Sequence, residues 1–566
     1  MKQKTLFVLL AVICLLTIFP FLGESLFQSK GEPREAIVAV SMLDSGNWIL
    51  PVNNGGDIAY KPPFFHWCIA LTSLIPGHVT EYTARFPSAV ALVVMTFFTF
   101  LFYARRCGAE LAFVTALVTL TAFEVHRAGW ACRVDMVLTA FIVLALFQLY
   151  RWFERGELGF PVWATLWMGC ATLTKGPVGI ILPCLVMGVF LLLKGRNFWS
   201  TVGKMVLVAV VSCILPAIWY AAAYHQGGDN FLSLVMEENF GRFMGKMSYE
   251  SHVHGPQYNL TTVLAGYVPY TLLMLLSIPL AIQGLKAWKK PQNWWKSFCN
   301  YIREMDNARL FSLLSIVLIF VFYCIPKSKR STYLLPIYPF IAYFLAEFLM
   351  YLRSGRPSLL RVYGSILSVV AFLPVAAFFL LKSGVASSLL PQDTGKGVGQ
   401  ILNLIETTPI DWIHWVYISL PIIAVIIFLR RLGKDRKGSG SVLYPLFGVI
   451  FTIYVSLDSV FLPEVLNAKS DKPVAEDIRV RVGDAPLYSY INVDMMRYFT
   501  INFYLHNRIK RFEVEHPQEG YLLIGPQDEE VFRTSFPGYQ LQEVYRSEKK
   551  SCDTKAPIVM YKFKKV

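Results

Sequence analysis

The sequence predicts a polytopic α-helical membrane protein with a small α/β domain at its C-terminal end. The 566 residues are 55% hydrophobic and only 16% charged, with a mean hydropathy of +0.47, whereas a soluble globular chain carries about 25% charged residues. The apolar residues form long runs separated by short basic connections, which is typical of a chain that crosses a bilayer many times. From Pro463 onward these runs stop.

A membrane span needs about 20 apolar residues, and runs of roughly that length predict about 13 transmembrane helices. The first run follows Lys2 and Lys4 and resembles a signal peptide, but no small-residue cleavage site follows it, so we expect an uncleaved first span. The expected helices cover residues 5–23, 82–104, 109–126, 135–153, 160–174, 177–194, 203–223, 260–284, 308–325, 333–352, 360–381, 411–430 and 442–462.

The placement of basic residues predicts the orientation of these helices. With a cytoplasmic N-terminus, every even-numbered connection is basic, as in the pairs Arg105–Arg106 and Arg430–Arg431. The odd-numbered connections carry fewer cations, mixed with acids, as the positive-inside rule requires. Topology therefore accounts for the net charge of +15, and we expect no nucleic acid partner. An odd number of spans puts the C-terminus on the outer, periplasmic side.

We expect two domains. Residues 1–462 form the membrane domain, with outer loops at 24–81 and 225–259, and residues 463–566 form the outer α/β domain. In the second domain, short apolar stretches predict strands at 486–491, 521–524, 539–545 and 558–563, with helices around 495–505 and 528–532. Nothing in this domain looks catalytic. The ten cysteines show no CxxC or metal-ligand spacing, so neither a disulfide framework nor a zinc site is predicted.

Charged residues near membrane depth are costly, so each needs a structural or functional reason. The candidates on the outer side are Glu32, Arg34 and Glu35 before an amphipathic stretch that ends at Asp44, Lys61 in Tyr60-Lys61-Pro62-Pro63, Arg133 and Asp135, Lys175, Arg242, and Lys327 to Arg330 before Tyr333. Singly, each has a structural explanation: a capped surface helix, a lysine that snorkels beside an aromatic belt, an Arg133–Asp135 pair that joins two helices, or a cation at a helix end. Together they predict an outer cleft rich in cations, which suits a phosphate or pyrophosphate.

The same residues carry a family resemblance. The order Glu-Pro-Arg-Glu-Ala, Tyr60-Lys61-Pro62-Pro63, Ala84 to Ser88, Arg133-Val134-Asp135, Thr174 to Pro177, Glu238 to Phe243, His254-Gly255-Pro256 and Ser328 to Pro336 resembles the ArnT-like and protein-mannosyltransferase-related membrane glycosyltransferases of GT-C fold. The resemblance covers roughly residues 1 to 350 in collinear order. Many members of this family also end in a small periplasmic domain.

The resemblance implies an enzyme of a bacterial inner membrane that takes a sugar from a polyprenyl-phosphate (undecaprenyl-phosphate) donor. The acceptor would be a glycolipid or glycan on the periplasmic side, most simply lipid A with aminoarabinose as the sugar. By matching motif, Lys61, Arg242 and Tyr333 would hold the donor phosphate, with Arg85 and Lys175 as supporting cations. Glu32, Arg34 and Asp135 would line the catalytic centre.

Two departures from the family pattern affect these roles. The family usually opens the first loop with two acids, and here Gly31 takes the first place. The lysine of Lys-Pro-Pro is often preceded by a glutamate that can join a metal site, and here Tyr60 stands there. We therefore assign no metal ligands, although a divalent ion remains an option. His252 and His254 are expected to be structural.

For the reaction we expect a single displacement that inverts the anomeric carbon, with Asp135 or Glu32 as the base if the acceptor is a hydroxyl. Rival interpretations are a polyprenyl-phosphate or lipid transporter or flippase, a protein O-glycosyltransferase, and a binding or assembly protein that acts through its tail. The one-sided placement of the charged residues argues against a transporter.

Overall fold

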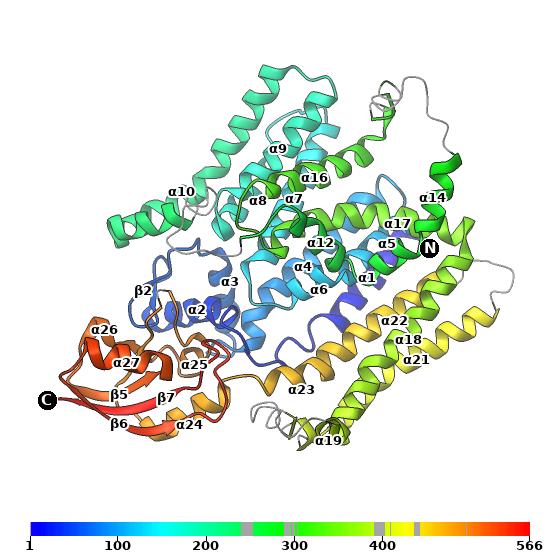
Figure 1. The fold of residues 1–566 in the computed structure, drawn as a ribbon. Helices are drawn as coiled ribbons and strands as arrows, with labels where there is room; N and C mark the ends of the chain where they lie inside the picture. Colours follow the sequence, from blue (N-terminus) through cyan, green and yellow to red (C-terminus); the bar gives the residue numbers. More distant parts are fainter. Residues whose placement is uncertain are drawn as a thin grey trace.

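The computed structural model describes residues 2–238, 253–287, 296, 300–302, 304–389, 402–403, 405–407, 409–434, 442–493 and 495–566. Within them the chain forms a large helical body followed by a small mixed sheet domain (Figure 1). The predicted fold class is thereby confirmed.

Eight helices in the described residues are long and apolar enough to cross a membrane, or up to ten if each of two bent pairs is one span, so the expected count of about 13 is not confirmed. The helices of the body are α1 (Gln3–Thr17), α4 (Glu81–Ala104), α5 (Ala109–Thr121), α6 (Phe123–Gly129), α7 (Val134–Glu154), α8 (Val162–Lys175), α9 (Val178–Leu193), α10 (Phe198–Met236), α12 (Gln257–Gly266), α13 (Tyr270–Leu276), α14 (Ile278–Ala287), α16 (Asn307–Cys324), α17 (Tyr338–Gly355), α18 (Pro357–Lys382), α19 (Val385–Leu389), α21 (Trp412–Lys434), α22 (Leu443–Ser456) and α23 (Leu462–Asn467), with short 3-10 and π segments η2 (Ser331–Ile337) and η3 (Leu457–Phe461).

Where the structure departs from the expected helices, a bend or a shortened helix explains the difference. The run at 109–126 breaks between α5 and α6 with a bend of 68°, and the run at 260–284 breaks between α12 and α13 with a bend of 103°. At the second break Pro269 lacks the N–H that a continuous helix needs. Helix α1 has 15 residues, fewer than the expected first span.

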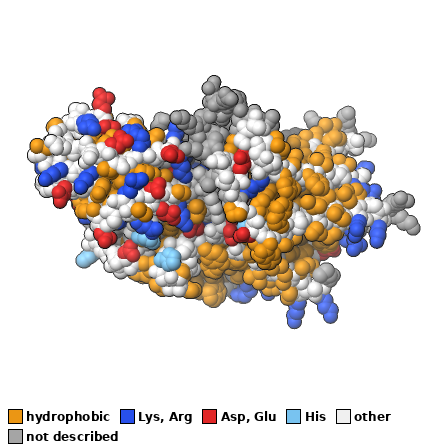
Figure 2. All heavy atoms as spheres, turned by 90° about the horizontal axis from the view of Figure 1, so that it is seen from below, with side chains coloured by type: hydrophobic (Ala, Val, Ile, Leu, Met, Phe, Trp, Pro, Cys, Tyr) orange, Lys and Arg blue, Asp and Glu red, His pale blue; other side chains and the backbone are white. Residues whose placement is uncertain are grey.

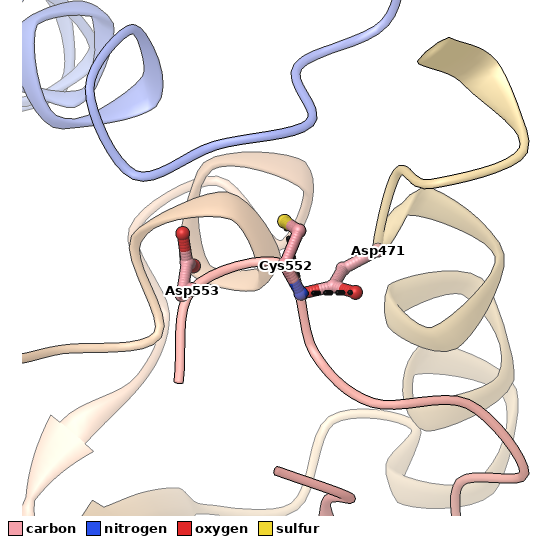
Figure 3. A group of neighbouring side chains, drawn as sticks. All are labelled: Asp471, Cys552 and Asp553. Carbon is pink, nitrogen blue, oxygen red and sulfur yellow. Dashed lines mark hydrogen bonds between the residues drawn. The ribbon is translucent and has the colours of Figure 1, made fainter. Parts of the chain in front are cut away.

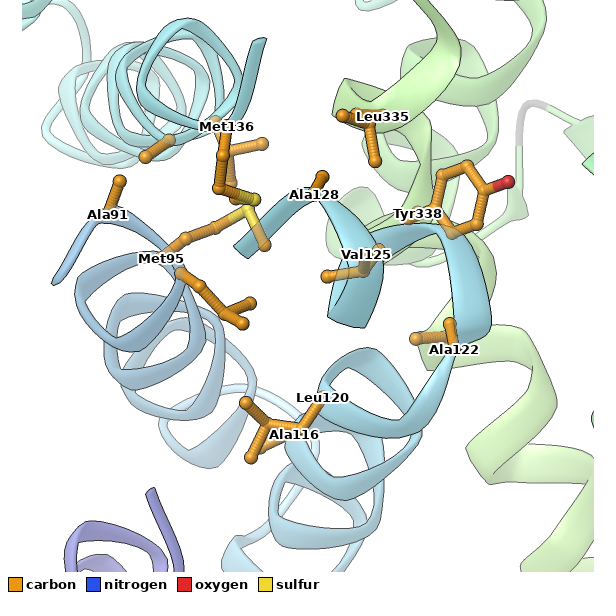
Figure 4. Packing of buried hydrophobic residues seen from close by; sticks show 14 of the residues in the cluster. Ala91, Met95, Ala116, Leu120, Ala122, Val125, Ala128, Met136, Leu335 and Tyr338 are labelled. Atoms are coloured by element: carbon orange, nitrogen blue, oxygen red, sulfur yellow. The ribbon is translucent and has the colours of Figure 1, made fainter. Parts of the chain in front are cut away.

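The core of the body is built around α7, of which 78% of the apolar window is buried, against 28% for α10 and α21 and 33% for α18. Figure 4 shows Ala91 and Met95 of α4 facing Met136 of α7, with Ala128 of α6 beside them. Small residues let helices approach closely where no water drives their association. The N-terminal end of α7, which carries Asp135, therefore packs closely against α4 and α6.

One outer loop supplies a helix and a hairpin that lie over the end of the body. Helix α2 (Pro33–Ser45) has Pro33 at its first position, where a missing N–H costs nothing, and it ends at Gly46 with a positive φ of 69°. The hairpin β1 (Val52–Asn53) and β2 (Asp57–Ile58) follows, and then α3 (Phe64–Ser73). The expected helix is confirmed as α2, but an amphipathic surface helix was the wrong description, because residues 35–42 are all buried.

The C-terminal domain contains a five-stranded sheet in the order β4-β3-β5-β7-β6. Strands β3 (Leu487–Tyr490), β5 (Glu519–Ile524), β6 (Tyr539–Arg546) and β7 (Val559–Lys565) confirm the four expected strands, and β3 pairs in parallel with β4 and β5 while β7 pairs antiparallel with β5 and β6. Helices α25 (Phe499–Tyr504) and α27 (Pro526–Ser535) lie where helices were expected, and α24 (Lys472–Val482), β4 (Lys510–Arg511) and α26 (Phe512–Glu515) were not expected.

The surface changes character along the molecule. Figure 2 shows hydrophobic side chains over most of the helical body, and a mixture of Lys, Arg, Asp and Glu over the sheet domain. The hydrophobic surface comes from residues such as Leu215, Ile218, Val369 and Leu373, which are 42–66% exposed. An apolar belt next to a polar domain fits a membrane-embedded body with a domain in water.

Candidate functional site

Glu32 stands at the N-terminal end of α2 and is held by Arg85 of α4. The Arg85 guanidinium donates to both Glu32 oxygens at 2.8 and 3.1 Å, and it also donates to the Leu22 and Ser25 carbonyls. The Cys132 backbone N–H donates to Glu32 Oε1 at 3.0 Å. Burial raises the pKa of Glu32, but Arg85 and the Cys132 N–H outweigh it and lower the pKa overall. Both oxygens of this carboxylate are therefore occupied.

Glu35 lies one turn further along α2 and joins three basic side chains. It accepts hydrogen bonds from Lys61 Nζ at 3.0 Å, Arg34 Nη2 at 3.2 Å and His66 Nε2 at 3.0 Å. Burial raises the pKa of the Glu35 carboxyl, but Lys61, the His66 hydrogen bond and Arg34 together hold it well below its usual range. Because the carboxylate is ionised, the His66 Nε2–H donates to it.

The surroundings of Lys61 lower the pKa of its amine below the ordinary value. Burial and the nearby Arg34 lower the pKa of Lys61, and Glu35 and Glu238 oppose that shift. The amine is 28% exposed, so it can reach a ligand in the cleft while Glu35 fixes its position.

Asp135 lies in the first turn of α7 and pairs with Lys175, the last residue of α8. The Lys175 amine donates to Asp135 Oδ1 and lies 4.5 Å from the centre of the Tyr333 ring. Within the part of the chain that the structure describes, Asp135 Oδ2 accepts no hydrogen bond. Asp135 is thus paired on one oxygen and available on the other. The pairing of Asp135 with Arg133, considered from the sequence, is not the one observed.

The three acids belong to one region of the structure. The loop at Cys132 and Arg133 lies between them. Cys132 interacts electrostatically with Glu32, Glu35, Arg85 and Arg133. The Arg133 guanidinium interacts electrostatically with both Glu32 and Asp135. Arg330, which precedes Tyr333, also acts on Asp135. The sequence-predicted residues Glu32, Arg34, Lys61, Arg85, Asp135, Lys175 and Tyr333 therefore gather at the N-terminal end of α7, and Arg242 lies outside the described residues.

Two members of the cluster have no role in the sequence-based prediction. Glu35 is a charged candidate without an assigned role, and the sequence did not single out His66, five residues after Lys61. Positions three apart lie on the same helix face. A helix that starts at Pro33 therefore predicts Glu35 on the same side as Glu32. His66 has no such local signal, because its partner is 31 residues away in the chain.

The C-terminal domain brings three potential metal ligands together, Asp471, Cys552 and Asp553, all buried. Their donor atoms are already occupied: Asp471 accepts from Ser551 Oγ and the Cys552 N–H, and Asp553 accepts from the N–H and hydroxyl of Thr500. Figure 3 shows the Asp471 carboxylate turned to the Cys552 nitrogen while the Asp553 carboxyl points elsewhere. This group is a hydrogen-bond network that joins α24, α25 and the segment before β7.

Of the two histidines that the sequence singled out, the structure describes one. His254 stacks on the ring of Tyr258 at 4.2 Å between ring centres, and His252 lies outside the described residues.

A polytopic membrane body with charged residues gathered under an outer loop, followed by a small sheet domain, defines a class of membrane protein with the GT-C fold. The solved structure of ArnT from Cupriavidus metallidurans bound to undecaprenyl phosphate matches 98% of this chain and 97% of its own, with a TM-score of 0.70 and 19% sequence identity. The same protein in the apo state matches with a TM-score of 0.67.

The sequence comparisons agree. The family model described as dolichyl-phosphate-mannose-protein mannosyltransferase matches residues 60–220. The undecaprenyl phosphate-alpha-4-amino-4-deoxy-L-arabinose arabinosyl transferase of Shewanella sediminis is 27% identical over 365 residues, 63% of this chain and 62% of that protein. A similarly named protein of Proteus mirabilis is 27% identical over 386 residues, 66% of this chain and 65% of that protein. The chain thus spans less than two thirds of the length of these relatives. The chain shares the fold of ArnT and is similar in sequence to these membrane glycosyltransferases, which agrees with the resemblance that its motifs indicated.

Proposed function

We propose that this protein is an integral membrane glycosyltransferase that moves a sugar from a polyprenyl-phosphate donor to an acceptor on the periplasmic side of a bacterial inner membrane. The observation that carries the proposal is the pairing of Lys61 and Lys175 with acids in one outer cluster, beside an Asp135 oxygen that accepts no hydrogen bond within the described chain. The arrangement offers cations for a phosphate and a carboxylate for the reacting oxygen. The names of the relatives support undecaprenyl phosphate as the carrier and 4-amino-4-deoxy-L-arabinose as the sugar, and the acceptor that the motif resemblance implies is lipid A or another envelope glycolipid.

In this proposal the donor phosphate is bound by Lys61, by the Tyr333 hydroxyl and by Arg242. The bond from the anomeric carbon to the phosphate oxygen breaks, and its electron pair leaves with the polyprenyl phosphate. Fixed cations stabilise the charge that develops there, and they do so most strongly where water is excluded. Lys175 contacts both Asp135 and the Tyr333 ring, so it would fix the position of the phosphate-binding Tyr333 relative to Asp135 on the acceptor side.

Between the two candidate bases, the hydrogen bonds favour Asp135. Both oxygens of Glu32 accept from Arg85, whereas Asp135 Oδ2 accepts from nothing in the described chain. Asp135 would take the proton of an acceptor hydroxyl, or orient an acceptor that is already anionic, while the acceptor oxygen bonds to the anomeric carbon from the side opposite the phosphate. Glu32, with Arg85, would fix the start of α2, and Arg34 would support Glu35.

The experiment is a transfer assay on the purified full-length protein, together with mass spectrometry of envelope glycolipids and glycoproteins with and without the gene product. We expect one sugar to be missing without the protein, and we expect Asp135→Asn to abolish transfer to a hydroxyl. The proposal fails if the wild-type protein neither binds undecaprenyl phosphate nor changes any envelope glycan. Full activity of the Asp135→Asn variant would remove Asp135 from its role.

A protein acceptor is a second candidate, because the matching family model is described as a protein mannosyltransferase. The same mass spectrometry separates the two, since a protein acceptor leaves the missing sugar on a Ser or Thr side chain rather than on a lipid.

A further inference from the structure

The cations of the outer cluster divide into those with a carboxylate partner and those without one. Lys61 and Arg34 share Glu35, Arg85 holds Glu32, and Lys175 holds Asp135. The guanidinium groups of Arg133 and Arg330 are different: no acceptor within the described chain lies within hydrogen-bonding distance of either. Both are half-buried, and a half-buried charge without a partner is costly, so it needs a ligand or another compensating group.

Gly31 makes the room for Arg133. A Cβ at position 31 would lie 1.7 Å from Arg133 Nη2 and 2.4 Å from its Cζ, so the guanidinium occupies the space of a side chain at that position. Gly31 is not among the glycines with a positive φ, so its backbone does not demand glycine. The close approach of Arg133 explains why glycine stands at position 31, where the resembling family usually has an acid. The space of that acidic side chain is taken by the positively charged Arg133 guanidinium.

Arg330 contributes a second unpartnered group, and Ser328 a third. Arg330 Nε and Ser328 Oγ are buried and have no hydrogen-bond partner among the residues that the structure describes, and Ser328 is only 7% exposed. Buried polar atoms are usually hydrogen-bonded, so each exception calls for an explanation such as a ligand. Both residues stand on the segment that leads into Tyr333.

We infer that Arg133 and Arg330, with Ser328, form a second anion-binding site in the cleft, which binds a phosphate group carried by the acceptor. Both guanidinium groups act on Asp135, and Asp135 is already balanced by Lys175, so their two charges remain uncompensated there. A phosphate accepts from two guanidinium groups through separate oxygens.

The position of the second site relative to Asp135 indicates whether it binds the donor phosphate or a phosphate on the acceptor. This step rests on the proposed function. In an inverting displacement the acceptor approaches opposite to the leaving phosphate, and Asp135 lies on the acceptor side. An anionic group beside Asp135 would be repelled unless fixed cations cancel the carboxylate charge. Lys175 cancels the Asp135 charge, so the further charges of Arg133 and Arg330 make the surroundings of Asp135 net positive, whereas Lys61 belongs to the group around Glu35.

The test measures ligand protection of the purified full-length protein in lipid nanodiscs, by thermal shift. The probes are undecaprenyl phosphate, bisphosphorylated lipid A and dephosphorylated lipid A. The variants are Arg133→Gln, Arg330→Gln and the double variant. Arg479→Gln is the matched control, because Arg479 is exposed on α24 and loses the same charge outside the cleft. Gly31→Ala is a further variant that keeps every charge but forces the Arg133 guanidinium to move.

We expect the wild type to prefer phosphorylated over dephosphorylated lipid A. Each single variant and Gly31→Ala should reduce that preference at least tenfold, and the double variant should abolish it, with undecaprenyl phosphate binding kept within about twofold. Loss of undecaprenyl phosphate binding in these variants would place both arginines in the donor site and overturn the inference. An unchanged preference in the double variant, or no preference in the wild type, would also overturn it. If the wild type does not bind undecaprenyl phosphate, the proposed function fails instead.

Discussion

At the scale of single residues, Glu35 opposes the lowering of the Lys61 pKa and fixes the position of the amine. Burial and Arg34 both disfavour the ammonium form of Lys61, and Glu35 is a direct counter-charge at 3.0 Å. His66, 2% exposed, donates to the same carboxylate and so fixes the other oxygen of Glu35. The position of the lysine is thus set by α2 and α3 together.

Replacement of Glu35 by Gln should lower the pKa of Lys61 further, because the burial and Arg34 effects remain while one of the two opposing carboxylate charges is lost. Lys61 then deprotonates at a lower pH than in the wild type, so the apparent KM for the donor should rise about tenfold or more at the alkaline end of the pH profile and recover toward the wild-type value at the acid end. The measurement is the pH profile of donor KM. Asp44→Asn is the control, since Asp44 lies exposed on the same helix. A defect that is equal at all pH values would indicate a purely structural role.

A second titration belongs to the C-terminal domain. Burial raises the pKa of Asp553 to about 7 from an ordinary value of 3.8. The folded protein therefore holds this proton more tightly than the unfolded chain, so folding stability falls as the pH rises from about 4 to about 7 and then levels off.

Asp553→Asn should remove that slope, because the amide is neutral at every pH and its oxygen can still accept from the Thr500 N–H. We expect a gain on the order of 2–4 kcal/mol for this domain at pH 8 and little change at pH 4, measured by amide hydrogen exchange of α25. Asp484→Asn, an exposed acid of the same domain, is the control. An unchanged slope in Asp553→Asn would assign the pH dependence to another group.

The site residues that could be predicted from the sequence are charged residues next to an apolar run, because the cost of placing a charge there can be recognised from the neighbouring residues alone. Asp135 and Lys61 stand at the ends of apolar runs, where a charge demands a reason. Ion pairs were harder to predict, since Asp135 pairs with Lys175, 40 residues away, rather than with Arg133, two residues away. The role of Gly31 could not be predicted, because the atom that fills its space comes from a side chain 102 positions later, Arg133.

At the scale of elements, α25 and the β1–β2 hairpin join the C-terminal domain to the outer loop. Asn502 Nδ2 donates to Asn54 Oδ1 at 2.8 Å, the Asn54 N–H donates to Asn507 Oδ1 at 2.9 Å, and Asn507 Nδ2 donates to Ser41 Oγ of α2 at 3.0 Å. Arg497 adds an ion pair to Asp57 at 2.9 Å. The domain therefore holds the helix that carries Glu32 and Glu35.

Asn507→Gly should loosen that contact without straining the backbone, since Asn507 has a positive φ of 57° that glycine tolerates. It leaves the Asn54 N–H without its acceptor, a cost of about 1–3 kcal/mol, and we expect faster hydrogen exchange in residues 41–58 together with reduced transfer. His506→Gly is the control, because His506 also has a positive φ of 53° and is exposed. Unchanged exchange in residues 41–58 would show that other contacts hold the domain.

Element prediction failed where tertiary contacts set the boundary. The apolar run at 109–126 reads as one span, yet it bends between α5 and α6, and α6 then places Glu124 and Arg127 beside Ser331 of η2. Strand β4 has two residues, too short for a periodic signal, and it forms because β3 offers a parallel partner. Long apolar helices such as α4 and α7 were predicted nearly to the residue, because burial in lipid dictates their length.

At the scale of the whole molecule, the basic loops lie together, away from the cleft. Arg106 pairs with Glu154, Arg196 with Glu157, and Arg353 with Glu110. These pairs join the end of α4 to the end of α7, the connection before α8 to the one before α10, and the end of α17 to the start of α5. The loops that the sequence assigned to the cytoplasm thus meet one another, and none of these contacts involves the residues around Asp135.

That arrangement predicts opposite accessibility for two cysteine substitutions, Ser354→Cys beside Arg353 and Ser535→Cys in the C-terminal domain, both at exposed positions. In cells with a permeabilised outer membrane, a membrane-impermeant maleimide should label Ser535→Cys at once and Ser354→Cys only after lysis, because the positive-inside rule keeps the arginine-rich end in the cytoplasm. The wild-type protein controls for its own cysteines. The reverse pattern would place the cleft in the cytoplasm, where a periplasmic acceptor could not reach Asp135, and the proposed reaction would have to be abandoned.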